Sequence, residues 1–233
     1  MRSADSTASA AFDQAAMLAA LRARVARLEG SGRAAAGHLD IPGLPGGGLA
    51  RAALHEVLAA APGCGAAFAA VLLGRCGGTV LWIAGAADSL QAWPPGLAGC
   101  GLDPADLILV RAERPQDALW AMEEALRCPA VAGAVLVLAD NLPLTATRRL
   151  QLAAEAGRAL GLLLRPGMLT AEPSAALTRW RVTPLTAVES PRWRLELLRA
   201  KGGAPDGPWT LAWQAATRQL RIEEAPAVHQ ATR

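Results

Sequence analysis

The chain has 233 residues, of which 52% are hydrophobic and 18% are charged, and its formal net charge is +3. This composition excludes a disordered chain and lies far below the charge density of a dedicated DNA-binding protein, while the length suits one globular unit. The four cysteines are widely spaced and form no CxxC pair, so we expect reduced thiols, no metal and no cofactor in a cytoplasmic protein.

The first predicted element is an amphipathic helix at residues 11–29. Its apolar residues recur at helical spacing: Leu18, Leu21, Val25 and Leu28. A stretch rich in Gly and Pro follows and predicts a linker, so residues 1–53 form the first expected unit. The apolar stripe has two interpretations, since it can fold back on its own core or serve as an interface for a partner protein.

From residue 54 onward, apolar segments and helical patterns alternate. We expect strands at 54–58, 78–84, 107–112, 131–139 and 161–165, and helices at 66–74, 115–128 and 145–160. Continuously apolar strands separated by helices are typical of a parallel sheet covered on both faces. The uncharged run at 57–74 consists mostly of Ala and Gly and is broken by Pro62, so it does not predict a membrane span.

After residue 176 the pattern changes to a period of two. Trp180, Val182 and Trp193 alternate with arginines, which predicts half-exposed antiparallel strands that extend the sheet, with a loop at 201–208. The outward side is a candidate basic face for DNA or a partner, formed by Arg179, Arg181, Arg192 and Arg194. If the tryptophans point inward, this face offers phosphate contacts but no base stacking. The core is therefore expected at 54–222, followed by a flexible tail at 223–233.

The stretch APGCGAAFAA, residues 61–70, stands where a nucleotide-binding α/β protein has its phosphate loop. When GxxxxGK[ST] is aligned with Gly65 as its second glycine, Ala66 takes the lysine position and Ala67 the Ser/Thr position. The residues of this degenerate P-loop are Ala60, Gly63, Gly65, Ala66 and Ala67. The charge that clamps phosphates and the hydroxyl that binds Mg²⁺ are both missing, and Lys201, the only lysine, lies too late to restore them.

No catalytic set can be defended elsewhere in the sequence. Asp140 follows the apolar run at the Walker B position, but without a Ser/Thr partner a cap of the following turn is the better interpretation. His55 and Glu56 are adjacent in a strand, so their side chains point to opposite faces and cannot act together. We therefore predict no catalytic residues and no metal ligands.

Five segments in this order carry a resemblance to a known family. They are IPGLPGGGLARAALHEVLAAAPGCGAAFAAVLLGR, GLDPADLILVRAERPQDALWAMEEALRC, TRRLQLAAEAGRALGLLLRP, SAALTRWRV and PRWRLELLRAKGG. Together they resemble the ImuA family, RecA-like and SulA-related proteins of bacterial mutagenesis cassettes. The match covers roughly residues 17–222 and lies in the ordered set of segments rather than in any one motif.

This resemblance implies a RecA-like core of the P-loop type and a role in SOS-induced, error-prone translesion DNA synthesis. The expected function is a non-catalytic adaptor that binds ImuB and, through that complex, an error-prone C-family DNA polymerase. RecA is a further candidate partner, and direct DNA contact stays open. The alternatives are a SulA-like inhibitor of cell division that acts on FtsZ and an active ATPase, which the missing lysine and hydroxyl disfavour.

Overall fold

The structure is a computed structural model that describes residues 37–61, 63–85, 92–140, 142–167, 173–186 and 190–223. The predicted N-terminal helix, with Leu18, Leu21, Val25 and Leu28, lies outside the described residues, and so does the tail beyond Glu223.

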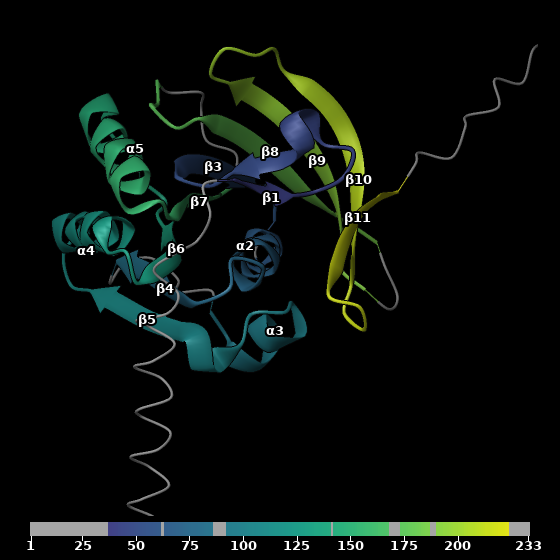
Figure 1. The fold of residues 1–233 in the computed structure, drawn as a ribbon, viewed down its shortest axis with the longest axis horizontal. Coiled ribbons are helices and arrows are strands. Elements are labelled where there is room, and N and C mark those ends of the chain that lie inside the picture. Colours follow the sequence, from purple (N-terminus) through teal and green to yellow (C-terminus); the bar gives the residue numbers. More distant parts are fainter. Residues whose placement is uncertain are drawn as a thin grey trace, which may run out of the picture.

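Alternating strands and helices build most of the chain (Figure 1). In chain order these are β3 (Ala53–Ala59), α2 (Cys64–Gly74), β4 (Thr79–Gly85), α3 (Pro94–Gly99), β5 (Leu107–Ala112), α4 (Pro115–Arg127), β6 (Val131–Val137), α5 (Leu144–Gly157) and β7 (Leu160–Pro166). Each strand expected in this part is present, and β5 has the expected bounds. The helix α3 at Pro94–Gly99 starts with two prolines, which fit the first helical turn because their missing N–H groups would be unpaired there.

Within the described residues, nine strands form one sheet in the order β11-β10-β9-β8-β3-β7-β6-β4-β5. The strands from β8 to β5 in this order pair in parallel, and those from β9 to β11 pair antiparallel. The predicted α/β class, with a mainly parallel sheet and antiparallel C-terminal strands, is thus confirmed.

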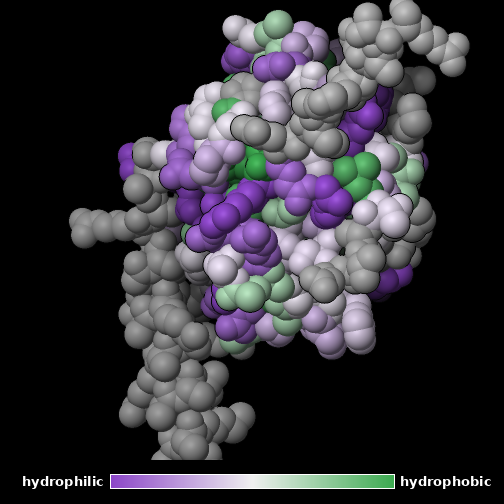
Figure 2. Space-filling model, turned by 90° about the vertical axis from the view of Figure 1, so that its right-hand side faces the viewer, coloured by the Kyte–Doolittle hydropathy of each residue, from purple (hydrophilic) through white to green (hydrophobic). Residues whose placement is uncertain are grey.

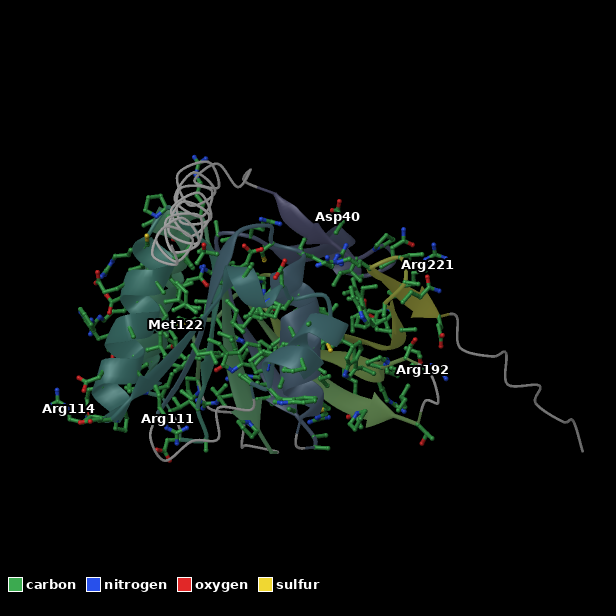
Figure 3. All side chains as sticks on the ribbon, turned by 90° about the horizontal axis from the view of Figure 1, so that it is seen from below. Asp40, Arg111, Arg114, Met122, Arg192 and Arg221 are labelled. Atoms are coloured by element: carbon green, nitrogen blue, oxygen red, sulfur yellow. The ribbon has the colours of Figure 1, made fainter. Side chains whose placement is uncertain are left out.

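Helices cover both faces of the parallel part of the sheet. On one face α2 and α3 pack over a large apolar core that includes Phe68, Trp82 and Trp193. On the other face α4 and α5 pack over a second core around Met122, Leu136 and Leu163. Met122 points from α4 into the interior, whereas Arg114 at the start of the same helix points outward (Figure 3). Strands buried on both faces have no reason to alternate, which explains their continuous apolar runs.

The stretch predicted as a linker is folded where the structure describes it. β1 (His38–Asp40) and β2 (Gly48–Ala50) pair as an antiparallel hairpin across a 3-10 turn at Pro45–Gly47. Leu39, Ile41, Leu44 and Leu49 of this hairpin are all buried in the core under α2. The expectation of a linker is therefore wrong for residues 38–53, where four apolar side chains tie a glycine-rich turn to the core.

The C-terminal strands are β8 (Thr178–Leu185), β9 (Arg192–Ala200), β10 (Asp206–Gln214) and β11 (Gln219–Glu223). Trp180, Trp193 and Trp213 are buried in the core, so the inward orientation considered for the first two is the one that the structure adopts. Phe68 of α2 meets the ring of Trp193 edge-on, with ring centroids 5.7 Å apart. Two expectations need correction: β8 pairs in parallel with β3, so the antiparallel extension begins only at β9, and Glu223 ends a strand instead of opening a tail.

Candidate functional site

The loop between β3 and α2 lies at the carboxyl edge of the parallel strands, where α/β proteins place ligands. Gly63 precedes the helix in a left-handed conformation, with a φ of 76°, which glycine adopts without strain. The backbone N–H of Ala60 donates to the carbonyl of Val182 at 2.9 Å, and the N–H of Gly167 donates to that of Ala59 at 2.9 Å. Neighbouring strand ends thus fix the start of the loop.

The positions that carry chemistry in the GxxxxGK[ST] motif take part in packing here. Ala66, at the lysine position, is buried in the core under α2, and Ala67, at the hydroxyl position, packs partly against it. A side chain at Gly65 would begin 2.4 Å from Leu164 Cδ1 and 2.6 Å from Ala59 Cβ. Gly65 therefore lets the first turn of α2 rest directly on β3 and β7.

Replacing Gly65 by alanine should lower the free energy of unfolding by about 2 kcal/mol, because the new methyl group overlaps two buried side chains. Chemical denaturation measures the change. The matched control is Gly99→Ala, where a Cβ meets nothing within 4 Å, and it should leave stability unchanged or slightly raised. Equal stability of the two variants would show that Gly65 is not held by packing.

The predicted Walker B residue stands apart from its strand. β6 ends at Val137, and Asp140 is exposed three residues later. Its backbone carbonyl, not its carboxylate, accepts a hydrogen bond of 2.7 Å from Nη1 of the buried Arg165. The next helix begins after Pro143 without a side-chain cap. Strand β7 separates β6 from β3, the strand that leads into the loop.

His55 and Glu56 point to opposite faces of β3, as predicted, and each is buried in its own network. The ring of His55 contacts Ala50 O through Nε2 at 2.8 Å and Thr178 Oγ1 through Nδ1 at 2.6 Å. Because a carbonyl only accepts, Nε2 carries the proton and Nδ1 accepts from the hydroxyl of Thr178. The ring thereby joins β2, β3 and β8 in its neutral form, and burial lowers its pKa to about 4.

This lowered pKa gives stability a defined dependence on pH. The pKa of His55 falls from its ordinary value of 6.5 to about 4 in the folded protein, so the unfolded chain takes up a proton that the folded chain excludes. Stability should be full above pH 6.5 and fall by about 1.4 kcal/mol per pH unit from there to about pH 4. Urea unfolding between pH 4 and 6.5 should show that the free energy of unfolding depends less steeply on pH in His55→Gln than in the unchanged protein. Parallel curves for the two proteins would contradict the assignment.

Glu56 forms a buried ion pair on the other face of the sheet. Its Oε2 lies 2.6 Å from Nε of Arg179, and both side chains are more than nine-tenths buried. The two residues are direct neighbours on the parallel strands β3 and β8. Arg179 therefore does not belong to an exposed basic face, because the carboxylate opposite it on β3 draws it into the interior.

Arg181, Arg192 and Arg194, the other arginines of the predicted basic face, are at least partly exposed to solvent. Figure 2 shows hydrophilic side chains in a band across this side of the molecule. In Figure 3, Arg192 and Arg221 lie at the edge of the molecule. Carboxylates on the same face partly neutralise this charge. Arg181 and Arg194 both pair with Glu196, at 2.9 and 3.1 Å, and Arg192 pairs with Glu223. Trp180 and Trp193 are buried and offer no stacking surface, whereas the half-buried Trp209 lines a cavity together with Arg194.

The described residues contain no cluster of three His, Cys, Asp or Glu side chains that could hold a metal ion. No described helix combines the length and apolar character that crossing a bilayer requires. All four cysteines are free, and burial raises the pKa of the Cys76 thiol to about 11.

The fold defines an α/β protein with a mixed nine-stranded sheet among its described residues, in which a glycine-bearing loop joins β3 to α2. No protein-family model matches the chain. Two curated proteins named Protein ImuA, from two strains of Caulobacter vibrioides, are 40% identical to it over 198 residues, covering 74% of this chain and 79% of theirs. The chain therefore belongs to the ImuA family.

A second likeness is shorter. The cell division inhibitor SulA of Edwardsiella piscicida is 38% identical over 88 residues, which is 37% of this chain and 49% of that protein. The predicted membership of the ImuA family is thus confirmed.

Proposed function

We propose that this protein is a non-catalytic, RecA-like adaptor of the SOS-induced mutasome. It binds ImuB and, through that complex, works with an error-prone C-family DNA polymerase in translesion synthesis, and RecA is a further candidate partner. The observation that carries the proposal is membership of the ImuA family over three quarters of the chain.

The loop after β3 supports the non-catalytic part of this proposal. Phosphoryl transfer depends on charges and a metal ion placed around the phosphates, and a P-loop protein supplies them through its Lys and Ser/Thr. Here those two positions are methyl groups, one of them buried in the core. A loop relieved of holding triphosphate can pack as ordinary core, which explains why alanine is tolerated at positions 66 and 67.

The proposed interface with ImuB is the apolar stripe of residues 11–29. Leu21→Asp combined with Val25→Asp should abolish co-purification of ImuB, because two carboxylates would have to be buried against the partner. The matched control, Ala20→Asp with Ala23→Asp, adds the same charge on the opposite side of the predicted helix and should retain ImuB. Retention of ImuB by both variants would remove this helix from the interface, and Mg²⁺-dependent turnover of ATP by the purified protein would overturn the non-catalytic assignment.

The second candidate function is inhibition of cell division through FtsZ. The observation that favours it is the 88-residue match to SulA. A deletion strain separates the two functions: loss of damage-induced mutagenesis supports the mutasome. Unchanged mutagenesis, together with filamentous cells on overexpression, supports the SulA-like role.

A further inference from the structure

A cavity of about 440 Å³ opens between α5, the segment that precedes β8 and the end of β9. Three cations border it: Arg148 from α5, Arg199 from β9 and Lys201 from the turn that follows. Ser174 and the half-exposed Leu152 complete much of the wall. The cavity lies away from the loop after β3, and it brings the only lysine of the chain next to two arginines.

Arg199 is held in place before any ligand arrives. Its Nη1 donates to the carbonyl of Ser174 at 2.8 Å and its Nη2 to that of Ala176 at 2.6 Å. Its Nε is buried and has no hydrogen-bond partner among the described residues. Carbonyl oxygens orient a guanidinium without cancelling its charge, so Arg199 presents a fixed and uncompensated positive charge.

The charges around this cavity differ from those of the predicted basic face. Arg181, Arg192 and Arg194 share carboxylate partners, whereas Arg148, Arg199 and Lys201 form no ion pair within the described part of the chain. Among the described residues that line the cavity, Glu155 is the one carboxylate, and it already accepts a hydrogen bond of 2.9 Å from Nε2 of Gln151. The described lining thus carries three cations and one carboxylate, which gives it a net positive charge.

We propose that this cavity binds a phosphate of a nucleic-acid backbone, an inference that rests on the proposed role in DNA damage tolerance. Guanidinium and ammonium groups are the side chains that bind phosphate oxygens, and Leu152 gives an apolar surface on which a sugar can rest. No aromatic side chain is among the described residues that line the cavity, so the proposed contacts are to the backbone and not to the bases. Binding is therefore independent of sequence and sensitive to salt.

The test is fluorescence anisotropy of the full chain with a labelled oligothymidylate of about 20 nucleotides, which exceeds the usual footprint of a single-strand-binding domain. Arg148→Ala and Lys201→Ala should each weaken binding about tenfold, and each should lower the slope of affinity against salt by about 1. The matched control is Arg114→Ala, which removes an exposed arginine at the start of α4 and should change affinity less than about twofold. Both cavity residues are exposed, so neither substitution threatens the fold.

Equal affinities of the cavity variants and the control would overturn the proposal. So would displacement of the oligonucleotide by polyglutamate at the same charge concentration as by unlabelled DNA, because the site would then recognise acidic peptides. Co-purification of ImuB separates this inference from the proposed function. If Arg148→Ala loses ImuB and keeps the oligonucleotide, the cavity belongs to the partner interface and the adaptor role stands.

Discussion

Replacing Arg179 by leucine should lower the free energy of unfolding by about 4 kcal/mol. Glu56 is 4% exposed at its side chain, and Arg179 neutralises it across the β3–β8 pairing. Without the guanidinium, a carboxylate stays in the interior with its charge uncompensated, or it must take up a proton. Either outcome costs far more than the lost contact alone.

Two further variants show whether burial causes this effect. Glu56→Leu together with Arg179→Leu should recover most of the loss, since apolar residues can replace a buried pair at little cost. Arg149→Met is the matched control, because Arg149 pairs with the buried Glu123 but is itself 67% exposed, and Arg127 still serves the same carboxylate. We expect the control to cost about 1 kcal/mol or less in urea denaturation. An equal loss from both single variants would contradict the role given to burial.

The parallel part of the sheet was predictable because its strands are buried on both faces. A segment such as VAGAVLV, residues 131–137, has no polar side to satisfy, so a short apolar run between turn residues already indicates a central strand. Helix α4 was equally predictable, since Met122 and Leu126 recur on its apolar side while Arg114 and Glu124 remain exposed to solvent.

The hairpin at residues 38–50 escaped prediction because its cues conflict. Its turn is rich in glycine and proline, and each of its strands has only three residues. Gly48 shows why glycine is needed there: its φ is 139°, and a Cβ would lie 2.1 Å from Leu39 O. Composition alone cannot distinguish such a tight turn from a flexible linker. The burial of Leu39 and Leu49 in the core identifies the segment as a folded hairpin.

The candidate sites were predictable only in part, because charge depends on neighbours from distant segments. The alternation along β8 is consistent with the inward orientation of Trp180. The residues around Arg179 do not indicate, however, that Glu56, 123 residues away in the sequence, lies opposite it. The cavity beside Lys201 is less accessible still to sequence reasoning. Its three cations come from a helix, a strand and a turn. The register between β8 and β9 also shifts next to the Arg179–Arg199 pair, which the sequence pattern does not indicate.

Replacing Gly157 by alanine should lower the free energy of unfolding by about 3 kcal/mol. This glycine ends α5, and a Cβ there would lie 1.9 Å from Leu126 O and 2.9 Å from the carbonyl carbon of Arg127. These atoms belong to the backbone at the end of α4 and cannot rotate away as a side chain would. The two helices must therefore separate, which opens the core around Leu126 and Leu150.

Gly96→Ala is the matched control for this variant, because its Cβ would meet only the ring of the exposed Trp93, at 3.1 Å. That ring can swing into solvent, so the control should cost less than about 0.5 kcal/mol. Helix α5 also carries Arg148 into the cavity proposed to bind phosphate, so its position matters for that proposal. If Gly157→Ala unfolds at the same urea concentration as the control, the close contact between α4 and α5 does not fix the position of α5, and the wall of the cavity is free to shift.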